Sequence, residues 1–291
     1  MSASLNPRFE QNCHLLSAAG GSLVACLATP TAVYLSADSR YAHAPPDLRD
    51  SARKLIACGP TALCGFSGFL RFTRTECGRH GDDLARQMTF ELSDIAEGLA
   101  FESPASIEPG LADMFVKCLH LALAPIWERF AIDLDQPFGS TATQAKSGVV
   151  PSLRLAQLFY VNREASGRAF LATIDLRHSV RRSTSGLYSS VLEPPVVRRL
   201  LFSAVEQPRL YLRGTRQRLR PGPLHGSVDG DTEALRIIDG IYKRARYASQ
   251  CAATIGGPVD VAVIDSAGRR WLKRKTEIRT CRHAESGPSH V

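Results

Sequence analysis

Short apolar runs that come in pairs around turn sequences are the feature that most constrains the fold of this chain. Residues 23–28 and 32–37 flank a turn at Pro30, and residues 54–58 and 62–67 flank the sequence Gly-Pro-Thr. Short runs on either side of such turn residues are typical of β-hairpins. We therefore expect two consecutive hairpins near the start of the chain.

The rest of the chain alternates between helical and strand-like patterns. Four stretches show the apolar spacing of helices: 82–100, 111–130, 194–205 and 231–250. Two further hairpins are expected, at 153–176 and 258–275, and a long loop rich in Arg, Pro and Gly at 206–230. Hairpins with helix pairs between them predict an α+β fold in which helices flank two antiparallel sheets.

Composition narrows the class of protein. The chain has 291 residues, of which 44% are hydrophobic, enough for a sizeable core, and no apolar run reaches the roughly 18–20 residues of a membrane span. Its eight cysteines are scattered without a Cys-x-x-Cys pair, which favours free thiols in a reducing compartment. We expect a cytoplasmic protein that contacts no membrane. The dispersed histidines predict no metal site.

The basic charge is concentrated late in the chain. The net charge is +8, and much of the excess lies in arginine and lysine clusters after residue 190. Such clusters can bind nucleic acid, but solvated loops are the commoner explanation. Nucleic acid is therefore not an expected partner.

Four residues at the ends of the first two hairpins point to acyl-transfer chemistry. A turn centred at residue 30 sets Ser22 opposite Asp38, and a turn near residue 61 sets Lys54 opposite Gly68. If the two hairpins are neighbours in one sheet, these four residues meet at one end of it. They would supply a nucleophilic hydroxyl, a cation that lowers its pKa, an anion that holds the cation, and a backbone N–H for an oxyanion.

No histidine falls in these runs, so the constellation lacks a general base. Cleavage between Gly21 and Ser22 would create one, because a free α-amino group titrates near pH 8 and would lie on the nucleophile's own residue. Gly21 would also give the backbone the freedom that attack by Ser22 on the Gly21 carbonyl requires. We therefore expect residues 1–21 to be a propeptide.

At these positions the chain resembles the β-type subunits of proteasomes. Their pattern is a glycine before the nucleophile, an Ala-Asp-Ser-Arg-like motif sixteen residues on, a lysine sixteen further and a small-Gly pair fourteen beyond. Gly21-Ser22, the motif around Asp38, Lys54 and Ser67-Gly68 match it. The likeness covers about 22–70 and is fainter at 231–264. It implies an N-terminal nucleophile hydrolase with a four-layer αββα sandwich, no cofactor, a peptide or protein substrate, and a homo-oligomer that could be ring-like.

The resemblance also assigns supporting roles. Ser185 resembles the serine of the family's mid-chain loop. The residues lining the pocket beside the nucleophile would be Tyr41, Ala52, Ile56, Phe66 and Leu70, which favours an apolar or small substrate side chain. The chain departs from the family in having Ser22 for threonine, Ala42 for another threonine, and Ala252 and Ile255 for the aspartate and serine that support the nucleophile's amine.

These observations predict a self-processing N-terminal-serine peptidase with a propeptide at 1–21, a proteasome-like domain at 22–275 and a disordered tail at 276–291. Two alternatives stay open. An amidase or peptide ligase could use the same acyl-enzyme, because an amine can resolve it as well as water. A non-catalytic scaffold subunit is the other, favoured by the residues present at 252 and 255.

Overall fold

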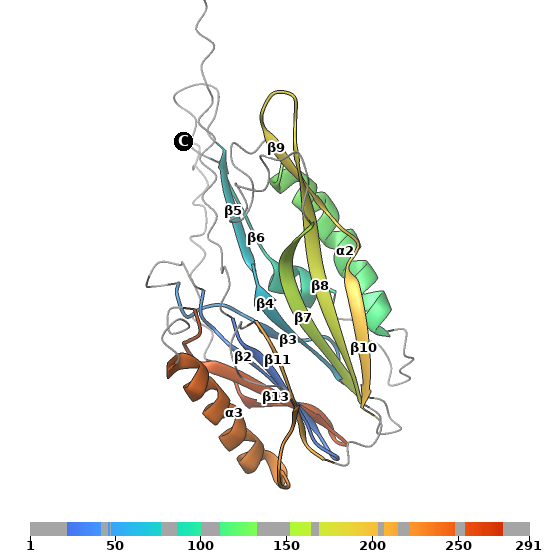
Figure 1. The fold of residues 1–291 in the computed structure, drawn as a ribbon, viewed down its shortest axis with the longest axis vertical. Helices are drawn as coiled ribbons and strands as arrows, with labels where there is room; N and C mark the ends of the chain where they lie inside the picture. The colour runs from blue at the N-terminus through green and yellow to red at the C-terminus, as the bar shows by residue number, and fades with distance from the viewer. Residues whose placement is uncertain are drawn as a thin grey trace, which may run out of the picture.

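The chain is an α+β protein with two six-stranded antiparallel sheets, a separate two-stranded hairpin and three helices in the part described (Figure 1). The structure is a computed structural model, and it describes residues 22–41, 46, 48–76, 86–99, 111–132, 152–163, 169–202, 207–214, 222–247 and 254–275. The first sheet has the strand order β12-β11-β1-β2-β13-β14. The second has the order β10-β8-β7-β4-β3, and β9 also pairs with β8.

The elements have the following bounds. The first sheet consists of β1 (Val24–Ala28), β2 (Val33–Asp38), β11 (Arg209–Arg213), β12 (Gly222–Pro223), β13 (Val259–Asp265) and β14 (Gly268–Lys273). The second consists of β3 (Leu55–Ala57), β4 (Ala62–Gly68), β7 (Ser152–Arg163), β8 (Ala169–Arg182), β9 (Tyr188–Leu192) and β10 (Val196–Phe202). The separate hairpin is β5 (Arg71–Glu76) with β6 (Arg86–Glu91), and the helices are α1 (Leu92–Gly98), α2 (Leu111–Phe130) and α3 (Gly230–Tyr247).

Four hairpins and two helices agree with the sequence analysis. The pairs β1–β2, β3–β4, β7–β8 and β13–β14 are all antiparallel neighbours, as the paired apolar runs predict. The helices expected at 111–130 and 231–250 are present as α2 and α3. None of the helices in the described ranges is long and apolar enough to cross a membrane.

The helix expected at 82–100 is largely wrong. Its described part begins with β6, and only α1 is helical. Phe90 stacks on Phe72 of β5 with ring centroids 4.7 Å apart, and the hydroxyls of Thr73 and Thr89 lie 3.1 Å apart. Cross-strand pairs of this kind stabilise a hairpin. They outweigh the apolar spacing of this segment, which is compatible with a helix as well as with a strand.

The helix expected at 194–205 is also wrong, because this stretch contains β10. It pairs with the first half of β8, from Val196 opposite Asp175 to Phe202 opposite Ala169. The loop expected at 206–230 contains β11 and β12, and β11 extends the first sheet beyond β1. Pairing with strands elsewhere in the chain determines the secondary structure of both segments, and local apolar spacing does not reveal such pairing.

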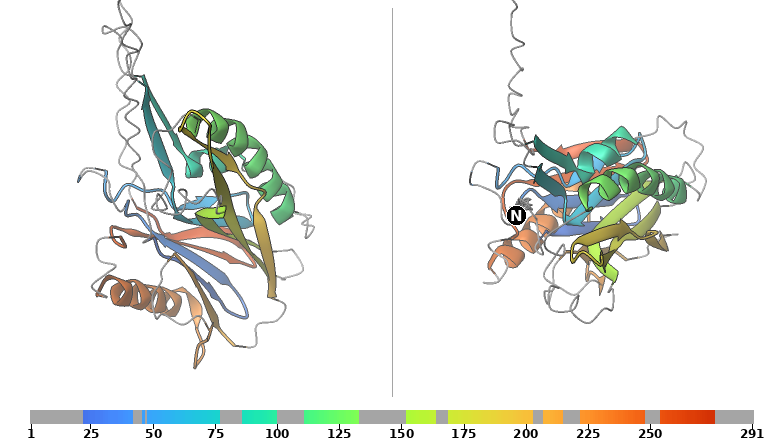
Figure 2. Two further views of the ribbon diagram at one scale, coloured as in Figure 1. Left: turned by 45° about the horizontal axis from the view of Figure 1, so that its top comes forward. Right: turned by 90° about the horizontal axis from the view of Figure 1, so that it is seen from above.

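Three buried apolar clusters connect these elements. One contains side chains of both sheets, among them Leu35, Leu63 and Phe159. A second joins the first sheet to α3 through Tyr242, and a third joins the second sheet and the β5–β6 hairpin to α1 and α2 through Trp127. Figures 1 and 2 show α3 beside the first sheet and α2 beside the second.

Four of the cysteines fall in the described ranges, and all four are free thiols. Cys26, Cys58 and Cys64 are buried, and Cys118 is half-buried. Burial raises the pKa of Cys26 to about 12, so its thiol stays protonated and packs as a small apolar group.

Gly65 of β4 allows the two sheets to approach each other closely. A Cβ atom on Gly65 would lie 2.7 Å from Cγ1 of Val24 in β1 and 3.4 Å from Cδ2 of Leu35 in β2. No real Cβ tolerates the shorter of these distances, so a side chain here would force the strands apart.

Replacing Gly65 by valine should therefore lower the free energy of unfolding by about 1–3 kcal/mol, the usual effect of overpacking a core. Gly240→Ala on α3 is the control, because no atom lies within 4 Å of its added Cβ. It should instead stabilise by up to about 1 kcal/mol through helix propensity. Urea unfolding measures both, and a Gly65→Val protein as stable as wild type would contradict this packing.

A buried polar network joins α2 to β8 and β9. The Nδ1 atom of His178 lies 2.7 Å from the Ser190 hydroxyl oxygen, which also accepts a hydrogen bond from Nε1 of Trp127 at 3.1 Å. His178 is almost fully buried, and burial lowers its pKa to about 4. The imidazole is therefore neutral in the folded protein near neutral pH.

This network predicts a loss of stability in acid. Between about pH 6.5 and about pH 4 the unfolded chain binds a proton on His178 that the folded chain excludes, so the free energy of unfolding should fall as the pH falls. Urea midpoints at about pH 7 and about pH 4.5 measure this dependence. In His178→Gln, which cannot take up the proton, the dependence should be smaller. An identical pH dependence in both proteins would assign it to other groups.

Candidate active site

The predicted site residues come from the ends of four strands in two different sheets. Ser22 lies just before β1 and Asp38 ends β2 in the first sheet, whereas Lys54 lies just before β3 and Gly68 ends β4 in the second. The condition under which the four residues were expected to meet, that both hairpins are neighbours in one sheet, is therefore not met. The side chains of Lys54 and Asp38 nevertheless meet, with Nζ 3.1 Å from each carboxylate oxygen.

The registers of the two hairpins also differ from those expected. Val24 pairs with Ala37, which sets Leu23, and not Ser22, opposite Asp38. The reason is the turn, which closes from Thr29 N–H to the Ala32 carbonyl and is centred between residues 30 and 31. In the second hairpin the loop closes from residue 58 to residue 62, so Lys54 lies opposite Phe66, whose N–H donates to the Lys54 carbonyl at 2.8 Å.

The carboxylate of Asp38 is the centre of the site. Its Oδ1 accepts a hydrogen bond from the Leu23 N–H at 2.9 Å, and its Oδ2 accepts from the N–H groups of Arg40 and Gly256, each at 3.2 Å. The side chains of Asp38 and Lys54 are both fully buried. Three backbone donors and one ammonium thus stabilise a charge that burial alone would disfavour.

The ammonium of Lys54 is held on two sides. Besides the Asp38 carboxylate, it donates to the Arg40 carbonyl at 2.6 Å. Burial lowers the pKa of Lys54, and the neighbouring Asp38 only partly opposes this effect. A buried lysine with a lowered pKa is a common feature of catalytic sites, although structural ion pairs share it.

Ser22 precedes Leu23, whose backbone N–H binds Asp38, and the Ser22 hydroxyl is buried without a partner in the described part of the chain. The side-chain oxygen has no hydrogen-bond partner among the described residues, and only 2% of the residue is exposed. The following residue, Leu23, is fixed at both ends of its backbone: its N–H binds Asp38, and its carbonyl accepts from the Tyr242 hydroxyl at 3.0 Å. An unpaired buried hydroxyl costs about 1–3 kcal/mol, which makes it a candidate functional group.

Two glycines allow the backbone to approach the site. A Cβ atom on Gly214 would lie 1.7 Å from the Ser22 carbonyl oxygen and 2.8 Å from Cβ of Ser67. Gly68 has φ of 105°, and its Cβ would lie 2.8 Å from the Leu155 carbonyl oxygen. Both positions therefore require glycine.

The five predicted pocket residues all belong to one buried cluster on the second sheet. None of Tyr41, Ala52, Ile56, Phe66 and Leu70 is more than 4% exposed. The structure thus brings them together as packed core between that sheet and its helices. Their role in contacting substrate stays a prediction.

Ser185 is not brought to the site. It lies in the exposed turn between β8 and β9, where its hydroxyl oxygen is 2.6 Å from that of Ser183. Gly68 is level with Leu176 on β8, through Ala156 on β7, and six more strand residues, about 20 Å, lead to the end of β8. Gly21, Ala42 and Ala252 lie outside the described residues, and Ile255 is fully buried.

Three contributors to the site were not predicted. Gly256 and Arg40 bind the Asp38 carboxylate and the Lys54 ammonium through their backbones, which no side-chain pattern reports. Tyr242 reaches Leu23 from the apolar face of α3. An aromatic residue with a hydroxyl on a buried helix face was the only available signal for it.

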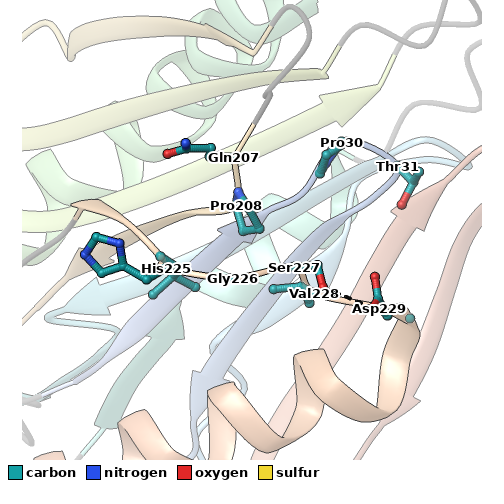
Figure 3. Close-up of a pocket in the computed structure, with 11 residues that line it drawn as sticks. Pro30, Thr31, Gln207, Pro208, His225, Gly226, Ser227, Val228 and Asp229 are labelled. Atoms are coloured by element: carbon teal, nitrogen blue, oxygen red, sulfur yellow. Dashed lines mark hydrogen bonds between the residues drawn. The ribbon is translucent and has the colours of Figure 1, made fainter.

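A cavity of about 720 Å³ lies at the turn end of the β1–β2 hairpin, away from Ser22 and Asp38 (Figure 3). Pro30 and Thr31 of the turn line it together with the loop before α3, including His225 and Asp229. It contains neither the buried ion pair nor the unpaired hydroxyl. We therefore place the candidate active site at Ser22.

Comparison of the sequence with protein-family models and with curated proteins gives no match.

Because the Lys54–Asp38 pair is buried, replacing either residue alone should strongly lower the free energy of unfolding. Lys54→Met leaves the Asp38 carboxylate buried without its cation and should cost about 3–5 kcal/mol. Asp38→Asn should also destabilise, and the double variant should lose less than the sum of the two, because neither charge is then left alone. Lys273→Met is the control: Lys273 forms an exposed pair with Asp239 at 3.4 Å and should change stability by less than about 1 kcal/mol. Urea unfolding of all four proteins tests this, and additive losses would contradict the coupling.

Proposed function

We propose that this chain is a self-processing N-terminal-serine hydrolase of the proteasome-like class, which cleaves peptide bonds through an acyl-enzyme on Ser22. One observation carries the proposal. The Lys54–Asp38 ion pair is fully buried, and Asp38 also binds the N–H of the residue that follows Ser22. The carboxylate thus links the lysine to the backbone of Leu23, the residue directly after the candidate nucleophile.

Maturation would be an attack on the chain itself. The Ser22 hydroxyl oxygen adds to the Gly21 carbonyl carbon, the Gly21–Ser22 C–N bond breaks, and an ester forms while the proton passes to the Ser22 nitrogen. Water then hydrolyses the ester, releases residues 1–21 as a free acid and leaves Ser22 with an α-amino group. Before this step the Ser22 nitrogen is an amide and cannot act as a base.

Turnover would use the new amine as a general base. The amine takes the proton of the Ser22 hydroxyl, and the oxygen attacks the substrate carbonyl; the Gly68 N–H is the assigned donor to the resulting oxyanion. The amine returns the proton to the leaving nitrogen, and water resolves the acyl-enzyme. The Lys54 ammonium favours the deprotonated hydroxyl electrostatically, and Asp38 orients Lys54.

The proposed fold is a four-layer αββα sandwich. The cluster shared by the two sheets, the contact at Gly65 and the helices packed on each sheet support it. We also propose a peptide or protein substrate, for which the buried pocket residues favour a small or apolar side chain, and assembly as a homo-oligomer.

A non-catalytic scaffold is the second candidate. Ile255, fully buried, stands where the resemblance places a serine beside the nucleophile, so one support of the amine is replaced by an apolar side chain. Hydrolysis and amide ligation share the acyl-enzyme and differ only in the group that resolves it.

Substitution of Ser22 separates enzyme from scaffold. The wild type and Ser22→Thr should lose residues 1–21 and react with a peptide epoxyketone, which needs the hydroxyl and the free amine of one residue. Ser22→Ala should keep its full mass and stay unlabelled. Intact-mass spectrometry measures both outcomes.

Ser39→Ala is the matched control. Ser39 is also buried with an unpaired hydroxyl and directly follows Asp38. Because the proposed mechanism gives its hydroxyl no role, its loss should leave processing and labelling unchanged. A wild type that stays at full length, or a Ser22→Ala protein cut before residue 22, would overturn the proposal.

A further inference from the structure

A second cavity, of about 220 Å³, lies where the edge strand β3 of the second sheet meets the edge strand β14 of the first. Its lining comes from Arg53 and β3 of the second sheet and from β13, β14 and the residues after β14, and α1 adds Glu97. None of the polar groups around Asp38 lines it. The predicted pocket residue Ile56 does line it, so the cavity adjoins the candidate active site without containing its polar groups.

Cations outnumber carboxylates in this lining. It contains Arg53, Arg269, Arg274 and Lys275, against Glu97 and Asp260. Glu97 is occupied, because it pairs with Arg53 at 2.7 Å. Oδ1 of Asp260 accepts a hydrogen bond from the backbone N–H of Lys275 at 2.7 Å.

Lys275 directs its ammonium at backbone carbonyls. The Nζ atom donates to the carbonyl of Ser51 at 2.9 Å and to that of Ala52. An ammonium has three N–H donors, so one is left for another acceptor. Burial lowers the pKa of Lys275 to about 8, and the Asp260 carboxylate only partly opposes this effect.

Arg269 is a second cation of this lining without a carboxylate partner among the described residues. Its backbone N–H binds the Pro60 carbonyl at 3.2 Å, which fixes β14 against the loop between β3 and β4. Its buried Nε has no hydrogen-bond acceptor, and neither Arg269 nor Lys275 forms an ion pair within the described part of the chain. Beside them, the guanidinium of Arg274 lies 5.0 Å from the ring centre of Trp271.

We propose that this cavity binds a compact oxyanion of the phosphate class, held by the guanidinium of Arg269 and the ammonium of Lys275. Arginine and lysine both form strong charge-assisted hydrogen bonds to phosphate oxygens. The volume favours a small ligand, because it exceeds the share of a few waters but is below the roughly 300–1,000 Å³ of sites for drug-sized molecules.

The anion would also stabilise the segment that precedes Lys54. Lys275 is bonded to the carbonyls of residues 51 and 52, so a ligand that orders the ammonium orders this segment too. Binding does not depend on the proposed hydrolase activity.

Titration of the full chain with inorganic phosphate tests the site. Calorimetry should show saturable binding, and phosphate should raise the melting temperature more than sodium chloride of equal ionic strength does. Arg269→Gln and Lys275→Gln should each weaken binding by about tenfold or more, the effect of losing one charge-assisted hydrogen bond. Circular dichroism checks that each variant is folded, and either variant alone suffices for the comparison.

Arg236→Gln is the control for net charge. Arg236 is exposed on α3, where it pairs with Glu233, and its loss changes the charge equally without touching the cavity. It should bind phosphate as the wild type does. No saturable binding by wild type, or equal binding by wild type and both cavity variants, would overturn the proposal.

Discussion

The ion pair between Lys54 and Asp38 joins the two sheets at a point where neither side chain touches water. Burying two charges costs several kcal/mol each, and their attraction offsets this only when the remaining hydrogen-bonding positions are also filled. Here the backbone N–H groups of residues 23, 40 and 256 and the Arg40 carbonyl fill them. Apolar residues could hold the sheets together as well, so the stability of the fold does not by itself require this pair.

The site follows from turn length and from glycine as much as from its charged residues. The two hairpin turns set which residues leave the strands near Asp38, and a different turn would move Ser22 or Lys54 by one position. Gly214 and Gly68 then allow neighbouring backbone to approach within distances that a Cβ would prevent. The Ser22 hydroxyl is buried and has no hydrogen-bond partner among the described residues, an arrangement that costs free energy.

Local patterns predicted four hairpins from short apolar runs around turn residues, and α2 and α3 from an apolar spacing that is long and regular. They failed at β6 and β10, where pairing with β5 and β8 outweighs a spacing that also suits a helix. The contact of Asp38 with Lys54 was predicted, but for the wrong arrangement of sheets, since alternation within a strand does not reveal its neighbours. Gly256 and Tyr242 reach the site through contacts between distant parts of the chain, which sequence spacing cannot report.

The donors to Asp38 come from widely separated parts of the chain, since residues 23, 40 and 54 lie near its start and residue 256 near its end. During synthesis, the carboxylate cannot acquire its full set of partners until the segment before β13 has left the ribosome. Such high-contact-order structure forms late. Any chemistry that needs all the partners of this carboxylate therefore cannot begin before folding is complete, and chains truncated before residue 256 would be inactive.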